Sequence, residues 1–441
     1  MSNVDVDVPE GDAPIPEEVI THKVVTARMS RSRQLGIGIA LAVIGLIAVL
    51  LLGRSAHSKT AVFDFNATGA GIEVPKLHLP GQTSCVVLGI VIVLLGIYQL
   101  VRGFSPRAMK WVGSITGVLF VVAFLAWAGS GGSTVQIGGL LQQSLFLATP
   151  LILGAMSGVL GERSGVINVA IEGEMLAAAF AGALVGTVAG NLWIGVLGAI
   201  IVGGLMGALL AVFSIKFLVN QVILGVVLNV FALGLTGFLF DALMANNQDA
   251  MNNPGFFNPI NIPLLSDIPV IGALLFSQNI IVYAMYVIVF VIDFALIRTR
   301  WGLRTRAVGE HPKAADTVGI NVLRLRYQNV IMGGCVAGLA GAFVTIGSVG
   351  SFTKNITSGN GFIALAALIF GRWTPRGALG AALLFGFATA LQTALSLLQT
   401  PIRIDSNLLG TLPYLATIFA VAGLVGKVRA PAADGEPYVK G

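Results

Sequence analysis

The stretch GERSGVINVAIEGEM, residues 161–175, places a charged turn directly before an apolar run that contains two acids. Glu162 and Arg163 fall in the turn, and Glu172 and Glu174 follow Gly165 within the apolar run. At 1.5 Å per residue, a helix that starts at the turn would carry both acids about 10 to 14 Å along its axis. That depth is close to the centre of a bilayer core about 30 Å thick, so the stretch predicts carboxylates inside a membrane helix.

The composition of the whole chain also indicates a membrane protein. Its 441 residues are 56% hydrophobic and only 10% charged, with a formal net charge of +6. A soluble protein usually has about a quarter of its residues charged. The apolar side chains exceed what a water-exposed fold of this length could bury, so we predict an integral membrane protein whose surface faces lipid.

Eleven apolar runs are long enough to cross a membrane, and a twelfth, residues 361–371, is only about half a membrane thick. When the short run counts as one crossing, every loop rich in Lys and Arg falls on one side, as the positive-inside rule requires. We therefore predict an all-α, polytopic transmembrane bundle of twelve passes, one of them short or broken, with both termini in the cytoplasm. The longer runs are 35–53, 85–101, 111–129, 137–160, 166–188, 192–215, 219–245, 270–297, 328–349, 376–398 and 408–426.

Charge and apolar patterning divide the chain into four parts. Residues 1–34 carry six acids and then four bases without an apolar period, which predicts a disordered cytoplasmic tail and not a signal peptide. Residues 35–133 contain three predicted transmembrane helices, and residues 134–427 contain the others. Residues 428–441 form a second predicted cytoplasmic tail.

Sequence motifs for catalysis are missing. The chain has no Gly-x-x-x-x-Gly-Lys-Ser/Thr run, nucleophile elbow or Rossmann fingerprint. Its four histidines never share a helical face, and Cys85 and Cys335 show no metal-binding spacing, so no metal site is expected. Movement of a solute is therefore the expected work of this chain, since buried polar groups in membrane helices usually mark such pathways.

Polar groups in the apolar runs are the candidates for that pathway. A carboxylate at mid-membrane depth costs several kcal/mol unless it is paired, protonated or wetted. Glu172 is therefore expected to line a cavity, to cap backbone groups at a broken helix, or to pair with a base such as Arg163 or Lys216. Asn168 should share its helical face, while Glu174 should point elsewhere. Further candidates are Asn229, Asn360 and Gln392, although each such residue alone is more often part of an interhelical hydrogen bond than of a pathway.

The longest predicted internal loop, residues 298–326, carries seven bases and two acids. Within it, Pro312 suits the first turn of a helix and Gly319 a left-handed stop. This punctuation predicts a two-turn helix on the cytoplasmic face. Such a helix could receive a soluble partner, or the loop could only set topology against lipid headgroups, which is the reading that charge alone favours.

Three ordered stretches resemble membrane permeases of nucleoside-type ABC importers, in the group that includes ribose and branched-chain amino acid permeases. The resemblance covers residues 136–427, which makes 134–427 the expected permease core and leaves 1–133 as an N-terminal extension. The matching stretches are ATPLILGAMSGVLGERSGVINVAIEGEMLAAAF (148–180), RAVGEHPKAADTVGI (306–320) and GFIALAALIFGRWTPRGALGAALLFG (361–386).

The resemblance implies a subunit that forms half of a translocation pathway for nucleosides in the cytoplasmic membrane. The partners it implies are a second homologous permease, a cytoplasmic ATPase that holds ATP and magnesium, and an extracytoplasmic substrate-binding protein, often a lipoprotein. No cofactor in this chain and no nucleic acid partner are expected. The pathway of the family also implicates the helices that match 168–174 and 362–370, which adds Phe362 to the candidates.

In that family the loop matching 306–320 forms the coupling helix, which sits in a groove of the ATPase. The residues implied in coupling are Glu310, His311, Pro312, Lys313, Ala315, Asp316 and Gly319, and the preceding turn, with a structural role, contributes Glu162, Arg163 and Gly165.

Two other functions remain open at this stage. A simple-sugar importer would have the same architecture. A secondary transporter would use Glu172 or Glu174 as a proton or sodium site and would need no ATPase, because midplane carboxylates couple such carriers to ions.

Overall fold

The computed structural model describes residues 30–67, 71–398, 400–402, 405–412, 414–415 and 429–440. Among these residues, ten helices are long and apolar enough to cross a membrane, and an eleventh apolar helix, α15, is shorter. The predicted polytopic helical bundle is confirmed. The count of twelve and the sides of the termini stay predictions, because most of the run at 408–426 and of the predicted tail at 1–34 lies outside the described residues.

The chain divides into two compact units. This division does not test the four parts predicted from charge and apolar patterning, which stay a prediction. The first unit comprises the described residues up to 54 and residues 83–124. Its membrane helices contain glycines where backbones pass closely: a Cβ added to Gly96 would lie 2.7 Å from the backbone nitrogen of Ala42. The elements that lie wholly or mostly in this unit are α1 Arg31–Leu46, the π-helical η1 Ile47–Leu52, α2 Gly53–Ser55, α3 Gly81–Val101 and α4 Pro106–Gly129.

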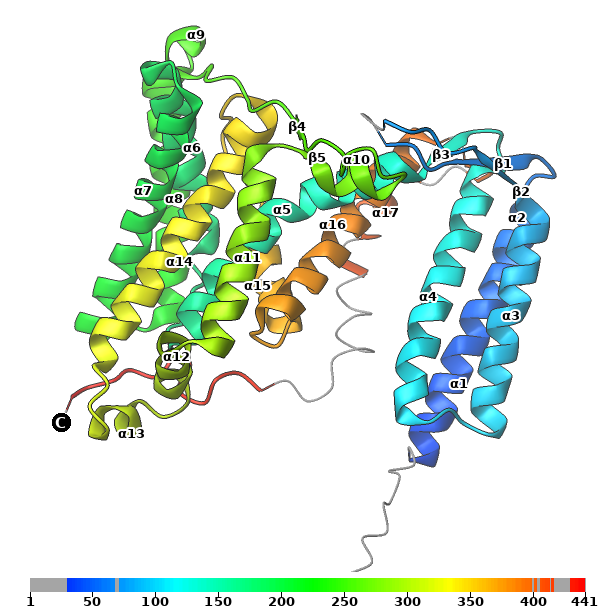
Figure 1. The fold of residues 1–441 in the computed structure, drawn as a ribbon, viewed down its shortest axis with the longest axis horizontal. Helices are drawn as coiled ribbons and strands as arrows, with labels where there is room; N and C mark the ends of the chain where they lie inside the picture. Colours follow the sequence, from blue (N-terminus) through cyan, green and yellow to red (C-terminus); the bar gives the residue numbers. More distant parts are fainter. Residues whose placement is uncertain are drawn as a thin grey trace, which may run out of the picture. The chain divides into compact units, whose positions relative to one another are not determined.

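The second unit, residues 55–82 and 125 onward, contains the remaining elements (Figure 1). In chain order they are β1 Thr60–Asp64, β2 Leu77–Pro80, β3 Thr134–Gln136, α5 Ile137–Glu162, α6 Ile171–Ala189, α7 Leu192–Ala211, η2 Val212–Lys216, α8 Gln221–Leu239, η3 Phe240–Met244, α9 Gln248–Met251, β4 Ile260–Asn261, α10 Ile271–Phe276, β5 Ser277–Gln278, α11 Ile280–Arg298, α12 Arg300–Glu310, α13 Pro312–Thr317, α14 Val322–Val344, η4 Thr345–Val349, α15 Asn360–Phe370, α16 Pro375–Leu397 and α17 Ser406–Leu409.

Two helices begin later than hydropathy predicts. The run at 166–188 becomes helical only at Ile171, because Gly165 has a left-handed φ of +86° and the chain needs several more residues to turn back into the bundle. The run at 270–297 splits into α10 and α11, because the side chain of Asn279 accepts hydrogen bonds from the backbone N–H groups of Ile281 and Val282 and starts a new helix. Hydropathy alone cannot detect such local caps.

The segment between α2 and α3 contributes two strands of a small sheet. β1 pairs antiparallel with β2 and parallel with β3, with Val62 opposite His78 and Phe63 opposite Val135. At the end of β1, Asp64 accepts a hydrogen bond from the backbone N–H of Asn66 and lies 3.2 Å from Lys76 Nζ. These contacts hold the pKa of Asp64 below its ordinary value, so the strand ends in a stable charged turn.

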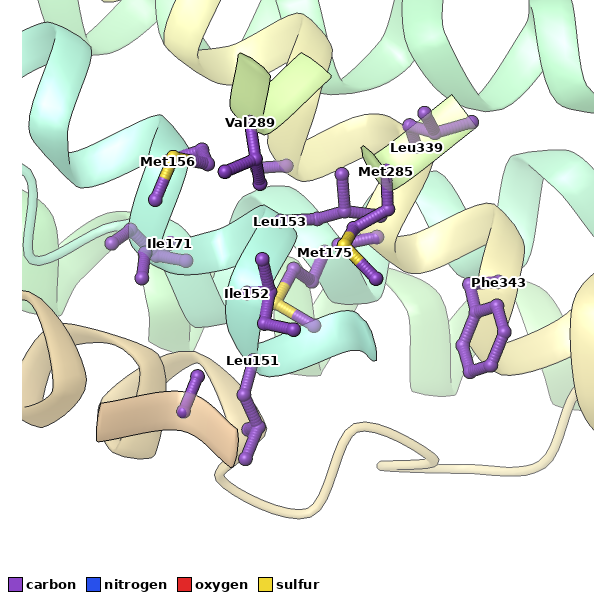
Figure 2. Packing of buried hydrophobic residues seen from close by; sticks show 14 of the residues in the cluster. Leu151, Ile152, Leu153, Met156, Ile171, Met175, Met285, Val289, Leu339 and Phe343 are labelled. Carbon is purple, nitrogen blue, oxygen red and sulfur yellow. The ribbon is translucent and has the colours of Figure 1, made fainter. Parts of the chain in front are cut away.

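The core of the second unit forms around α5, which is the helix most enclosed by protein. In its most apolar stretch, 89% of the residues are buried. Figure 2 shows Leu153 and Met156 of α5 with Met175 of α6, Met285 of α11 and Phe343 of α14, all within one cluster. A helix that is apolar on every side and surrounded in this way is a central support for its neighbours.

Helices α7 and α14 cross at paired glycines, Gly203 and Gly207 of α7 and Gly334 and Gly338 of α14. Small residues four positions apart are typical of helices that pack closely in membranes. A Cβ added to Gly207 would lie 3.0 Å from the Cα of Gly334, and one added to Gly338 would lie 2.9 Å from the Cα of Ile200. Both distances are shorter than an ordinary carbon–carbon contact. The two backbones therefore touch, and the crossing leaves no room for larger side chains.

One end of the second unit gathers its basic segments, and we call it the basic end. It consists of the turn at 163–170, α12, α13, the turn at 371–374 and residues 429–440, and Figure 1 shows α12, α13 and the last of these segments together. The loops around α9, β4, β5 and α10 lie at the opposite end. The cytoplasmic location of this end, which the positive-inside rule predicts, stays a prediction.

Candidate translocation pathway and coupling surface

Glu172, in the first turn of α6, caps the start of the short helix α15. Its carboxylate accepts hydrogen bonds from the hydroxyl of Thr357 at 2.6 Å and from the backbone N–H groups of Gly359 at 2.9 Å and Gly361 at 2.6 Å. The first N–H groups of a helix have no partner within the helix, and a negative charge there is favourable. Glu172 was expected to line a cavity, to cap a broken helix or to pair with a base. Its described contacts are those of a helix cap, and neither Arg163 nor Lys216 is among its described partners.

Asn168 does not share a helical face with Glu172, and that expectation is wrong because Asn168 precedes the start of α6. Its carbonyl oxygen accepts from the N–H of Ala170 at 3.1 Å, and its amide donates to the carboxylate of Glu174 at 3.1 Å. The hydroxyl of Ser157 on α5 also donates to Glu174, at 3.4 Å. Asn168, Glu174 and Ser157 therefore form one buried polar group between α5 and α6.

Asn229 joins α8 to the start of α6. Its carbonyl oxygen accepts from the N–H of Gly173 at 2.7 Å, and its amide donates to the carbonyl of Val169 at 2.9 Å. These are the interhelical hydrogen bonds that were one of the two expectations for this residue. Any further role of Asn229 in a pathway stays a prediction.

Two adjoining cavities lie toward the end opposite the basic end. The outer one has a volume of about 430 Å³ and the inner one about 150 Å³, and Phe146 and Ser348 line both. The inner cavity reaches Pro150, about 20 Å along α5 from Ile137 at 1.5 Å per residue. The outer lining is Gly139, Gln142, Gln143, Phe146, Phe256, Phe257, Pro259, Ser277, Gln278, Asn279, Gly347 and Ser348; the inner lining is Phe146, Leu147, Pro150, Leu151, Phe343, Val344, Ser348, Asn360, Ile363 and Thr389.

The cavities combine aromatic rings with side-chain amides. Phe146 and Phe343 pack with ring centroids 4.9 Å apart, and Phe256 is exposed at the outer cavity. No described residue forms a hydrogen bond with the side-chain amide of Gln143 or of Asn360. An amide offers two donors and an acceptor, and a ring offers a face for stacking. The lining can therefore bind a flat, polar heterocycle.

Of the predicted pathway residues, Asn360 lines the inner cavity. Phe362 lies on α15 with 49% of its surface exposed, and Gln392 lies three residues after Thr389 on α16. The described cavity linings do not include Asn168, Glu172, Glu174, Asn229, Phe362 or Gln392.

Sequence reasoning missed Gln143 and the aromatic residues of these cavities. The adjacent amides of Gln142 and Gln143 within the apolar run at 137–160 were a detectable signal, because polar side chains are unfavourable in a lipid-facing helix. Phe256 and Phe257 carry no such signal, since they lie in a loop and only the fold brings them to the cavity.

At the basic end, the turn after α5 supports the turn between α15 and α16. Arg163 donates from Nε to the carbonyl of Trp373 at 2.6 Å and from Nη2 to that of Arg372 at 3.3 Å, and the Trp373 indole N–H donates to Glu162. Arg372 and Trp373 both have positive φ, of 55° and 53°, which costs about 1–2 kcal/mol per residue. Burial lowers the pKa of Arg163 below its ordinary value. Gly165, also at positive φ, completes the turn.

The predicted coupling helix is α13. Pro312 lies in its first turn, His311 is its N-cap residue, and Gly319 follows it with φ +83°, as the sequence punctuation predicts. Ala315 is buried on its inner side, while His311 and Lys313 are exposed. Asp316 and Gly319 line a surface cavity of about 430 Å³, and Glu310 at the end of α12 accepts a hydrogen bond from the N–H of Ala432 at 3.3 Å. Coupling itself stays a prediction.

Comparison with known proteins gives a match to the permease component of branched-chain amino acid transport systems over residues 140–422, so α1–α4 precede the matched region. The chain is 42% identical to the guanosine ABC transporter permease protein NupQ of Bacillus subtilis (strain 168), over 68% of this chain and 95% of that protein. It is 37% identical to the nucleoside ABC transporter permease protein NupC of Lactococcus lactis subsp. cremoris (strain MG1363), over 70% and 98%. It is 35% identical to the putative glucose ABC transporter permease protein TsgC13 of Haloferax volcanii, over 64% and 89%. No solved structure matches the chain significantly.

These matches confirm the resemblance drawn from the three motifs. Proteins of this kind are transport components and not enzymes, and the ten apolar helices agree with a multi-pass protein of the plasma membrane. The family match covers more than half of the chain, including the pathway candidates, α13 and the linings of both cavities except Gly139. The chain therefore belongs to the permease family of branched-chain amino acid transport systems.

Proposed function

We propose that this chain is the permease subunit of an ATP-driven importer of nucleosides and forms half of its translocation pathway. Its partners are a second homologous permease, a cytoplasmic ATPase that binds ATP and magnesium, and an extracytoplasmic substrate-binding protein. The similarity to NupQ and NupC over nearly their whole length supports this assignment. That this chain binds no cofactor stays an expectation.

The observation that carries the substrate class is the lining of the two adjoining cavities. A nucleobase has two π faces and an edge of hydrogen-bond donors and acceptors. The cavities offer rings beside the amides of Gln143 and Asn360, which have no hydrogen-bond partner among the described residues. The nucleoside enters the outer cavity from the binding protein and passes Phe146 and Ser348 into the inner one. At the basic end, α13 receives the motion of the ATPase, and the two permeases open alternately to each side.

Two alternatives receive less support. A simple sugar has no π face for stacking, so three phenylalanines in the outer cavity favour a heteroaromatic solute, although one relative is a putative glucose permease. An ion-coupled secondary transporter needs a midplane carboxylate that is free to bind its ion. Glu172 is instead held by three donors at the start of α15, which favours a structural role.

The proposed binding site predicts a measurable loss of uptake in Asn360→Ala and Gln143→Ala. Each change removes one hydrogen-bonding amide from a cavity wall, and the loss of one such bond corresponds to roughly threefold to tenfold weaker binding. Guanosine uptake into vesicles that contain the complete transporter should show an increased KM of that size, with a larger increase in the double variant. Asn253→Ala, in an exposed loop, is the matched control and should behave as the wild type.

The same assay tests the energy source. Uptake should stop without ATP and continue when ionophores collapse the ion gradients. An unchanged KM for guanosine uptake in both amide variants would refute the cavities as the binding site. Uptake that depends on an ion gradient and not on ATP would refute the assignment as an ABC permease.

A second prediction concerns coupling through α13. Deletion of residues 312–318, or Gly319→Ala, should leave membrane insertion intact but separate ATP hydrolysis from uptake, because Gly319 ends α13 in a left-handed conformation that alanine adopts only at about 1–2 kcal/mol. Gly190→Ala is the matched control: Gly190 also has positive φ and open space for a Cβ, but it ends α6 at the opposite end. Unchanged nucleoside transport per ATP in the Gly319 and deletion variants would contradict a coupling role.

A further inference from the structure

Residues 429–440, predicted as part of a cytoplasmic tail, run along the basic end, and we call them the 429–440 strap (Figure 1). The N–H of Ala433 donates to the carbonyl of Gly309 in α12 at 2.9 Å. The guanidinium of Arg326 in α14 donates to the carbonyl of Glu436 at 2.9 Å and to that of Ser164 at 3.1 Å. The strap therefore connects α12, α14 and the turn after α5.

The strap also completes a small apolar core beneath α13. Tyr438 is buried against a cluster to which Ala315 of α13 and Val322 of α14 contribute. Close packing continues along the strap, because a Cβ added to Gly435 would lie 2.7 Å from the side chain of Ile167, and one added to Gly165 would lie 2.9 Å from the carbonyl of Ala433. Release of the strap would thus uncover the inner side of α13.

The strap places the carboxyl group of Asp434 beside that of Glu162. Among the described residues, one buried oxygen of each carboxyl, Glu162 Oε1 and Asp434 Oδ1, has no hydrogen-bond partner, and neither does the buried Nη2 of Arg326. The charged groups that face Asp434 are Glu162 from α5 and Arg326 from α14, and Glu436 and Tyr438 of the strap face the same guanidinium. Two adjacent buried carboxyls are satisfied when they share one proton.

We propose that one proton shared between Glu162 and Asp434 holds the 429–440 strap on the basic end, and that the docked strap positions α12 and α13 for the cytoplasmic partner. The first part depends only on the contacts of the strap. The second part rests on the proposed function.

Because a shared proton holds the strap, docking of the strap should weaken as the pH rises. Burial raises the pKa of Asp434 from 3.8 to about 7, although the neighbouring Arg326 opposes this shift. Docking therefore takes up a proton above pH 3.8, and the docking equilibrium should weaken about tenfold per pH unit as the pH rises from 3.8 to about 7, then level off. Asp434→Asn is neutral without a proton, so its strap should stay docked across this range.

The test measures the separation of spin labels at Val318→Cys and Val439→Cys, which are 74% and 66% exposed, in the complete transporter in nanodiscs. The background carries Cys85→Ala and Cys335→Ala. We expect one narrow distance at pH 5.5, a population of longer distances that grows up to about pH 7 and changes little from there to pH 8, and a narrow distance throughout in Asp434→Asn. Glu436→Gln is the matched control: it removes a charge that faces Arg326 but keeps the backbone carbonyl that accepts from Arg326 and both carboxyls of the pair, so it should keep the pH dependence of the wild type.

Each result decides one part of the proposal. A distance distribution that is the same at both pH values in the wild type, or a strap released by Asp434→Asn, would overturn the shared proton. Release with an unchanged ratio of ATP hydrolysed to nucleoside transported would overturn the positioning of α13 alone. Failure of the wild-type complex to transport nucleosides would instead reject the proposed function and leave the distance measurement valid.

Discussion

Glu172→Ala should lower the free energy of unfolding by about 3–5 kcal/mol and abolish uptake. The substitution leaves the N–H groups of Gly359 and Gly361 and the hydroxyl of Thr357 without their acceptor at the buried start of α15. A buried donor without a partner loses its full hydration free energy, and a charged acceptor makes each bond stronger than a neutral one. Thermal unfolding of the purified chain in nanodiscs measures the loss.

Two further variants make this experiment specific. Glu172→Gln keeps one carbonyl oxygen but presents an NH₂ group to one of the donors, so its loss should be roughly half as large. Asp249→Ala removes an exposed acid in α9 and should change stability by less than about 0.5 kcal/mol. A Glu172→Gln protein as stable as the wild type, with pH-dependent uptake abolished, would favour an ion-coupled transporter over the capping role.

Gly338→Val should prevent the bundle from assembling, with a cost of at least about 3 kcal/mol. A Cβ on residue 338 would lie 2.9 Å from the Cα of Ile200, so α7 and α14 must separate to admit even one carbon. Among the described helices, the backbones of these two approach each other most extensively, and their contact at paired glycines is what allows the backbones to pack in lipid.

The control for this substitution is Gly234→Val in α8, where an added Cβ meets nothing within 4 Å. Size-exclusion chromatography after mild detergent extraction should recover monodisperse Gly234→Val protein and little or no Gly338→Val protein. Equal recovery of the two variants would show that the glycine crossing contributes nothing to assembly.

Hydropathy and loop charge were sufficient to predict the helical bundle, the short α15 and the punctuated α13. These features depend on the residues within each segment, since the bilayer requires a certain apolar length and the backbone requires glycine or proline at particular turns. Element boundaries were less predictable. The start of α6 at Ile171 depends on the left-handed Gly165, and counting residues from the turn placed Asn168 in a helix that it precedes.

The partners of the buried polar groups were beyond the reach of sequence reasoning. Counting along the chain predicted that Glu172 lies deep in the membrane and needs compensation, but a pathway role and a structural role, as a cap or in an ion pair, were about evenly supported. The fold selected one of them by bringing residues 357–361 to the first turn of α6. The same is true of Gln143, whose signal was visible, and of Phe256, which only the packed loop brings to the outer cavity.

The sequence by itself determined that this chain spans a membrane many times, which segments form helices, and that carboxylates are buried among them. Solvation requires these features, and solvation is read from residue type and spacing alone. Only the tertiary structure decided which donors Glu172 satisfies, that Asn168 joins Glu174, and that the 429–440 strap brings Asp434 to Glu162. The physical reason is that hydrogen bonds and carboxyl pairs act over about 3 Å, between segments whose separation along the chain carries no information about their distance in space.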